Sequence, residues 1–215
     1  MNASQEQEKI APEIVVLPES HRQPIWHVII LNVFTMFGYS LIWFYKNCSQ
    51  LAGLDRKIVN GEIAVAQPGE AGNWPAQDAK AAMATLTKVN PVLFTVGLLV
   101  PVVQLVLVTI FFTTAARLYP GERPLTTLHP WLCGIALTLS MLGLLCCGAL
   151  PGFAFLAYLT AAIPLAFTQY LLNAFWQTIE PEDHVVRQAF SGGELFMLIT
   201  GSVLLGLVVT GLVNH

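Results

Sequence analysis

The chain of 215 residues is 55% hydrophobic and only 11% charged. Because ordinary soluble domains carry about 25% charged residues, this composition excludes that class of protein. The formal net charge is −3 and the ten basic residues are mostly scattered singly. A nucleic-acid partner is therefore excluded too, since it would need clustered Lys and Arg.

No Asp, Glu, Lys or Arg occurs between Trp131 and Ile179. This stretch is over twice the roughly 20 apolar residues that one helix needs to cross a bilayer. The sequence therefore predicts an all-α fold, a polytopic transmembrane helical bundle with about five spans. A transmembrane domain at residues 25–215 would follow a flexible tail at residues 1–24, which is polar and lacks the apolar core of a signal peptide.

The first span is predicted from about Trp26 to Phe44, roughly 28 Å at 1.5 Å per residue. Trp26 stands at one end and Trp43 at the other, as aromatic rings do at membrane interfaces. An extramembrane loop is predicted at residues 46–90. The residue pattern in the first part of this loop favours an interfacial helix whose basic residues contact anionic lipid. The alternative is that these basic residues only flank the end of a span. A Gly- and Pro-rich linker at 61–75 then leads to a second short helix.

The second span is predicted from about Val92 to Ala116. Pro101 lies inside it and should kink the helix, because proline removes a backbone hydrogen bond. Gln104 carries an amide that needs a partner in hydrocarbon. We expect an interhelical hydrogen bond there, and a pore-lining role is the alternative.

The third span begins at Pro130 and ends near Leu150. Pro151 and Gly152 then turn the chain directly into the fourth span. Because this connection is so short, the two spans should form a tight antiparallel hairpin.

Three amides repeat every four residues near the end of the fourth span, at Gln169, Asn173 and Gln177. That spacing places them on one face of a helix. They form either a polar seam bonded to a neighbouring helix or the wall of a wet cavity.

The fifth span follows Ser191 and Glu194, whose spacing predicts a capping box at the start of a helix. Further along, three small residues lie four apart, at Ser202, Gly206 and Thr210. Such a stripe lets another helix approach closely. We expect it to pack against a helix of this chain or of a partner.

Three segments carry a resemblance to known proteins. The stretch 37–47, FGYSLIWFYKN, resembles the FG-Y-x-x-x-W-F-Y-K/R-N end of the first span in a family of uncharacterised bacterial integral membrane proteins. Segments 169–176 and 190–194 look like the Q-x-x-L-N-x-Y-W and F-S-x-G-E segments of its longer members, although Phe175 replaces the usual Tyr. The resemblance implies a bacterial inner-membrane location and supplies no activity or catalytic residue.

We expect no enzymatic activity and no catalytic residue. The sequence has no His-Glu-x-x-His motif, no paired acids within a span and no nucleophile beside a base. Its four cysteines show neither metal-ligand spacing nor a disulfide framework, so we expect no metal and no cofactor.

The leading functional hypothesis is a non-catalytic integral membrane protein, an accessory or scaffolding subunit. It would act through helix packing with itself, as a homo-oligomer, or within a larger membrane complex, with membrane lipid around it. The alternative is a small-solute channel or transporter, which the lack of ionisable groups inside the spans disfavours. Five spans would place the 61–75 linker and His215 on the same side of the membrane.

Overall fold

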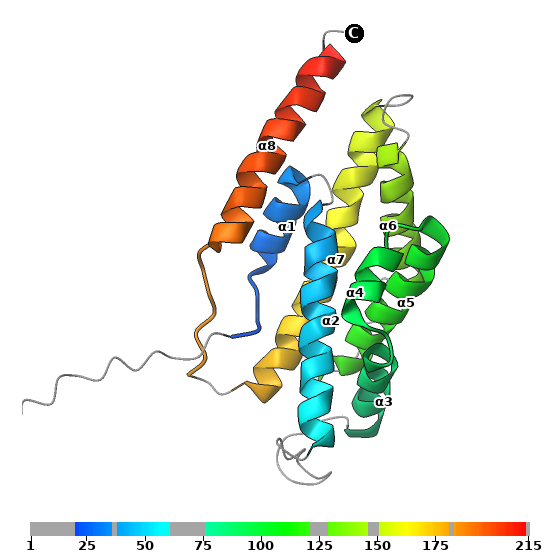
Figure 1. The fold of residues 1–215 in the computed structure, drawn as a ribbon, viewed down its shortest axis with the longest axis vertical. Coiled ribbons are helices and arrows are strands. Elements are labelled where there is room, and N and C mark those ends of the chain that lie inside the picture. The colour runs from blue at the N-terminus through cyan, green and yellow to red at the C-terminus, as the bar shows by residue number, and fades with distance from the viewer. Residues whose placement is uncertain are drawn as a thin grey trace, which may run out of the picture.

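The computed structural model describes residues 20–35, 38–60, 76–120, 129–145, 151–180 and 183–213. These ranges contain helices and no β-strand, which confirms the all-α class (Figure 1). The helices are α1 (Ile25–Phe34), α2 (Gly38–Val59), α3 (Ala76–Thr87), α4 (Pro91–Gly97), α5 (Pro101–Leu118), α6 (Pro130–Leu145), α7 (Pro151–Ile179) and α8 (Gly192–Val213).

The helices run mostly along the long axis of the molecule (Figure 1). Helices α3 and α4 pack on α2, α5 packs on α3, α6 and α7, and α1 packs on α7. Helix α8 stands at the outer edge beside α1 (Figure 1). The C-terminal ends of α2 and α8 therefore lie at opposite ends of the molecule (Figure 1).

The predicted first span is two helices rather than one. Helix α1 ends at Phe34 and α2 begins at Gly38, running back in the opposite direction (Figure 1). Thr35 serves both helix ends, because its hydroxyl donates to the Leu31 carbonyl at 2.7 Å and accepts from the Tyr39 N–H at 2.8 Å. These bonds satisfy backbone groups that a helix end leaves open. The single span predicted from Trp26 to Phe44 is thus wrong.

The predicted second span is also a hairpin. A Cβ built on Gly97 of α4 would lie 2.7 Å from the Leu107 side chain of α5, so α4 folds back along α5. Val100 is extended, with φ −104° and ψ 111°, as a residue before proline tends to be. Pro101 then occupies the first turn of α5, where its missing N–H is no loss. Pro101 begins a new helix instead of kinking a continuous one.

The predicted extramembrane loop at 46–90 contains two helices that belong to the bundle. Its first part continues α2 as far as Val59 instead of forming a separate interfacial helix. Its last part includes α3, whose Met83 and Leu86 are buried in the same core as Leu51 of α2. The linker at 61–75 lies outside the described residues.

Helices α6 and α7 form the predicted antiparallel pair, but α7 includes Pro151 and Gly152, which were predicted to form the turn. They begin at Pro130 and Pro151, run antiparallel and pack on each other (Figure 1). Pro164 lies inside α7 without ending it, and the Thr168 hydroxyl donates to the Pro164 carbonyl at 2.8 Å. The residues that join the two helices lie outside the described ranges.

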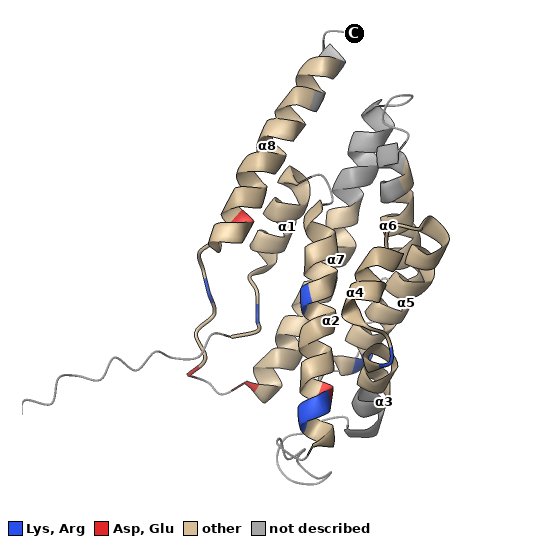
Figure 2. Cartoon of the chain, in the orientation of Figure 1, with Lys and Arg blue, Asp and Glu red and all other residues tan. Residues whose placement is uncertain are grey.

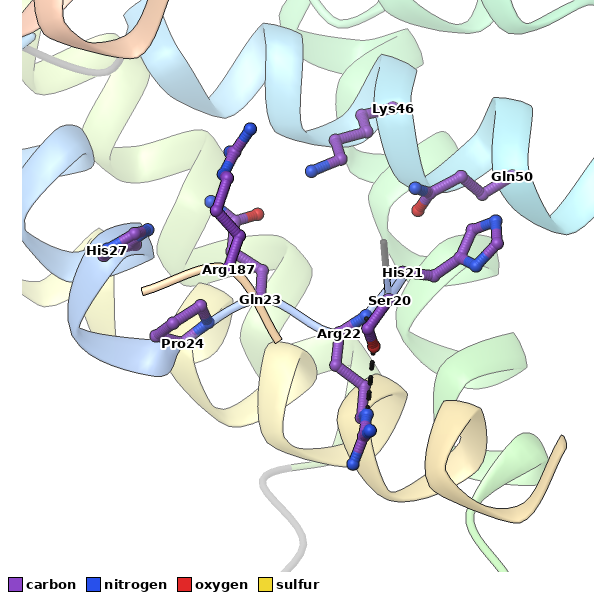
Figure 3. A pocket seen from close by; sticks show the side chains of 9 residues that line it. All are labelled: Ser20, His21, Arg22, Gln23, Pro24, His27, Lys46, Gln50 and Arg187. Carbon is purple, nitrogen blue, oxygen red and sulfur yellow. Dashed lines mark hydrogen bonds between the residues drawn. The ribbon is translucent and has the colours of Figure 1, made fainter. Parts of the chain in front are cut away.

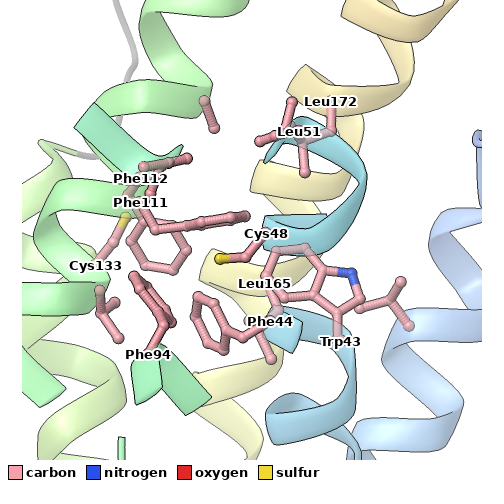
Figure 4. Packing of buried hydrophobic residues seen from close by; sticks show 14 of the residues in the cluster. Trp43, Phe44, Cys48, Leu51, Phe94, Phe111, Phe112, Cys133, Leu165 and Leu172 are labelled. Atoms are coloured by element: carbon pink, nitrogen blue, oxygen red, sulfur yellow. The ribbon is translucent and has the colours of Figure 1, made fainter. Parts of the chain in front are cut away.

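An aromatic cluster between α2, α4 and α5 forms part of the core (Figure 4). Phe44 meets Phe111 edge to face, with ring centroids 5.1 Å apart, and Trp43 meets Phe44 in the same way at 5.0 Å. Phe94 of α4 packs on Phe111 at 6.2 Å. Each such pair contributes about 0.5–1.5 kcal/mol beyond the burial of its area. This cluster therefore holds the α4–α5 hairpin against α2.

Two of the described helices are long and apolar enough to cross a membrane, α5 over Pro101–Leu118 and α8 over Gly192–Gly211. Most charged residues lie toward the lower end of the view in Figure 2, and the acidic residue in the first turn of α8 lies above them. Helix α1, the part of α2 before Lys46 and the part of α8 after Glu194 carry none. In the described part of the chain, charge is thus concentrated toward one end of the molecule.

Candidate functional site

Polar side chains meet where segment 20–24 crosses α7 and α2. Glu180, just after α7, has a side chain only 4% exposed, forms an ion pair with Arg22 at 3.2 Å and is hydrogen-bonded to the His21 Nδ1 at 2.9 Å. Its carboxylate also accepts from the Ser20 hydroxyl and from the His21 backbone N–H. Burial alone would raise the pKa of Glu180, but the hydrogen bonds from Ser20 and His21 outweigh it and hold that pKa below its usual value.

Two of the three predicted seam amides join α7 to α2 and to segment 20–24. The Trp43 indole N–H donates to the Gln169 side-chain oxygen at 2.7 Å, and the Gln169 amide donates to Asn173 at 2.7 Å. Asn173 in turn donates to the Gln23 carbonyl at 2.7 Å and accepts from the Gln23 backbone N–H at 3.0 Å. Gln177 is exposed and stands outside this network. The seam thus forms a chain of bonded groups over most of its length.

The start of α8 carries the predicted capping box. The Ser191 backbone N–H donates to the Glu194 carboxylate at 2.8 Å, and the Glu194 N–H donates to the Ser191 hydroxyl at 3.2 Å. Glu194 also forms an ion pair with Arg187 at 2.7 Å and accepts from the Gln23 amide at 3.4 Å. Gln23 therefore links the cap of α8 to the seam on α7.

A polar pocket of about 250 Å³ opens beside this junction (Figure 3). Its walls come from segment 20–24, α1, α2 and the segment before α8. The lining residues are Ser20, His21, Arg22, Gln23, Pro24, His27, Lys46, Gln50 and Arg187. A second pocket, of about 510 Å³, shares Arg22, Gln23 and Pro24 and reaches Asn173 and Gln177 on α7.

The remaining predicted site residues meet few partners. Gln104 is fully buried, yet neither of its amide atoms bonds to a described residue. Gly206 and Thr210 are exposed, and a Cβ built at Gly206 would meet no described atom within 4 Å. Ser202 is partly buried and donates to the Leu198 carbonyl at 2.7 Å in its own helix. The predicted stripe is therefore free of contacts with other helices at Gly206.

The close helix contact of α8 lies at Gly201 instead. A Cβ there would overlap the Phe34 carbonyl oxygen and lie 2.7 Å from the Thr35 Cα. The end of α1 thus packs directly on the α8 backbone. The sequence holds only a weak signal of this contact, because glycine is common in apolar helices.

Segment 20–24 was predicted to belong to a flexible tail at residues 1–24, and in the structure it bonds to α7 and to Glu180 just after it. Gln23 is only 4% exposed, and every residue from Ser20 to Gln23 forms a side-chain or backbone hydrogen bond. The sequence does contain a signal that this segment could be held in place. Polar residues precede the first apolar helix, and they can pair with an acidic residue such as Glu180 after α7. Residues 1–19 lie outside the described part.

The described residues hold no group of three or more His, Cys, Asp or Glu that could bind a metal ion. No family model matches the chain, and no curated protein or solved structure is significantly similar to it. The junction and its pockets therefore have to be interpreted from their own chemistry.

Proposed function

We propose that the chain is a multi-pass integral membrane protein of the bacterial inner membrane that acts as a non-catalytic accessory or scaffolding subunit. Helix packing would be its mode of action, with α8 as the docking helix. The observation that carries this proposal is an apolar helix of membrane-spanning length that the rest of the chain leaves largely uncovered.

Only 12% of the apolar stretch of α8 is buried within the chain. Phe196, Ile199 and Leu207 are each more than half exposed. Its one charged residue, Glu194, is engaged in the helix cap and with Arg187. Because a soluble protein rarely exposes so large an apolar surface, lipid and a second helix are the natural surroundings of α8.

The occupant that we propose for the small-residue stripe is α8 of a second copy. The stripe at Ser202, Gly206 and Thr210 carries no charge, so two copies facing each other would not repel. Small residues let two helix backbones approach closely in lipid. A two-fold contact that pairs the same surface of both copies also closes without forming a filament.

Replacing Gly206 with Leu tests this arrangement, with Gly211→Leu as the matched control. Gly211 is also exposed without a neighbour, but it lies five residues away on a different helix face. We expect Gly206→Leu to raise the dimer dissociation constant roughly tenfold, a loss of about 1.4 kcal/mol, because the leucine side chain would hold the two helix backbones apart. Native mass spectrometry in mild detergent measures the change.

The control should dimerise like the unchanged protein. A wild-type chain that is monomeric in mild detergent would overturn the dimer, and so would equal losses from both substitutions. A stoichiometric partner of different sequence on α8 would replace the second copy as occupant while keeping the role of an accessory subunit.

The alternative of a small-solute channel or transporter has less support. A polar path along α7 would need Gln169 to face water. Gln169 is buried instead, and its amide bonds to Trp43 and Asn173.

A further inference from the structure

The turn of the α1–α2 hairpin lies against the middle of α8. A Cβ built on Gly201 would overlap the Phe34 carbonyl oxygen at the end of α1. Gly201 lies nine residues after Gly192 and ten before Gly211, which bound the apolar stretch of α8. Because those 20 residues span roughly 30 Å, the thickness of the hydrocarbon core, the turn would lie near the middle of a bilayer that α8 crosses.

The hairpin has the length of one leaflet. Helix α1 has 10 residues and is roughly 15 Å long at 1.5 Å per residue, which is half of the hydrocarbon core. Helix α2 runs back in the opposite direction and packs on α1 (Figure 1). The chain can therefore enter the bilayer, turn at its midplane and leave on the side where it entered.

The exposed side chains of the hairpin form a surface suited to lipid. Trp26 lies nine residues before Thr35 and Tyr45 ten residues after it, so the antiparallel helices bring these two exposed aromatic rings to about the same level. Tyr and Trp rings favour the membrane interface. Ile29 and Ile42 are exposed between this level and the turn, where acyl chains would surround them. The pattern marks one membrane surface instead of two.

The turn also supplies partners for its own backbone. The Thr35 carbonyl accepts from the Gly38 N–H at 3.0 Å, and the Thr35 hydroxyl bonds to both helix ends. Backbone groups in hydrocarbon need partners within the protein, because no water reaches them there. The missing side chain of Gly201 lets α8 cover the Phe34 carbonyl directly. These contacts fit a turn that lies inside a bilayer.

The distribution of basic residues indicates which leaflet the hairpin enters. Arg56 and Lys57 are exposed in the last turn of α2, beyond the level of Tyr45, and Arg117 is exposed in the last turn of α5. At the other end, where α6 leads into α7, the sequence contributes none, because residues 131–179 include no Lys or Arg. Lys and Arg are in excess on the cytoplasmic side of membrane proteins. The open end of the hairpin therefore faces the cytoplasm.

We infer that the α1–α2 hairpin inserts into the cytoplasmic leaflet alone, with acyl chains against Ile29, Phe34 and Ile42 and headgroups at the level of Trp26 and Tyr45. This inference rests on the membrane insertion in the proposed function, but not on the α8 dimer. It gives the protein a contact surface for a single leaflet. It also places the two polar pockets, which share segment 20–24 before α1, on the cytoplasmic side.

Photoreactive lipids test the depth of the hairpin in the unchanged protein. The full chain is reconstituted in vesicles of phosphatidylethanolamine and phosphatidylglycerol, with a diazirine either at the end of an acyl chain or in the headgroup of the phosphatidylglycerol. Mass spectrometry of the crosslinked peptides should find Phe34 labelled by the chain-end probe, and Trp26 and Tyr45 by the headgroup probe. Labelling of Phe34 by the headgroup probe would overturn the inference, and so would the absence of chain-end labelling at Phe34.

A charge placed on the lipid-facing surface tests the same contact by stability. Ile42→Arg should lower the unfolding temperature in vesicles by several degrees, because a charged side chain in hydrocarbon is costly. Val59→Arg is the matched control, since Val59 is also an exposed aliphatic residue of α2 but lies beyond Tyr45 at the end of the helix. It should change the unfolding temperature little. Equal losses from the two substitutions would mean that Ile42 does not face acyl chains.

Compartment-sensitive reporters test the side of insertion, one placed ahead of Met1 and one within residues 61–75. Both should report the cytoplasm. Reporters on opposite sides would mean that α1 and α2 cross the bilayer, and both outside would mean that the leaflet is wrong. Gly206→Leu should keep the lipid-labelling pattern, so failure of the α8 dimer is distinguishable from failure of this contact. Recovery of the chain in the soluble fraction of cells would instead refute the membrane insertion in the proposed function.

Discussion

Two glutamines inside the bundle have opposite environments. Gln169 bonds to Trp43 and Asn173, whereas Gln104 is buried without a bond to the described residues. The sequence identifies both as amides that need a partner in an apolar surrounding. It cannot identify Trp43 as the partner, because 126 residues separate Trp43 from Gln169 and no spacing rule spans such a distance.

Glu180 makes stability depend on pH. Its pKa is lower in the folded chain than in the unfolded one, because Ser20 and His21 bond to the carboxylate more strongly than burial disfavours it. The stabilisation is therefore fully present above the unfolded pKa of roughly 4.3 and is lost as pH falls through the lower folded pKa. Glu180→Gln should destabilise the protein at neutral pH and make little difference well below the folded pKa.

Thermal unfolding of the unchanged protein and of Glu180→Gln in detergent, from neutral pH to below the folded pKa of Glu180, measures the difference in stability. His21→Ala at the same pH values reports how much of the effect passes through that partner. A difference in stability between the unchanged protein and Glu180→Gln that stays constant as pH falls would contradict the proposed role of the Glu180 carboxylate.

At the scale of elements, the sequence predicts helix starts well and chain reversals poorly. Pro130 begins α6 as expected, and Ser191 with Glu194 caps α8, whereas α7 begins at Pro151, which was predicted to lie in the turn before it. The reversals near Thr35 and before Pro101 escape prediction, because hydrophobic residues continue through both of them. A run of apolar residues has the same composition whether it crosses a bilayer once or folds back on itself.

The contact between α1 and α8 depends on Gly201. A side chain there would overlap the backbone of Phe34 and Thr35, which cannot turn away as a flexible side chain can. Gly201→Val should therefore destabilise the protein by about 1–3 kcal/mol, the usual cost of overpacking. Thermal unfolding in detergent at a concentration where the chain is monomeric measures this loss.

The matched control is Gly211→Val on the same helix, where a Cβ meets nothing within 4 Å. It should change stability far less. Equal effects of the two substitutions would mean that valine acts through helix propensity and that α8 does not lie against α1.

At the scale of the molecule, charge and hydropathy indicate a membrane protein but leave its path undetermined. Five spans would divide the ten basic residues equally between the two sides, so the positive-inside rule gives no orientation. The path follows from contacts between distant residues, such as Phe94 with Phe111 in the α4–α5 hairpin. Two hairpins replace two of the five predicted crossings.

This path changes the predicted topology. Val59 at the end of α2 and Ala76 at the start of α3 lie near one end of the molecule, and the C-terminal end of α8 lies near the other (Figure 1). With the long axis along the membrane normal, the 61–75 linker and the C-terminus would face opposite compartments. Five alternating spans would place both on one side.

The most direct measurement is therefore a pair of compartment-sensitive reporters, one inserted between Gly61 and Pro75 and one fused after His215. A membrane protein with hairpins at α1–α2 and α4–α5 predicts that the two reporters are active on opposite sides of the membrane. Activity of both reporters on the same side would contradict this arrangement.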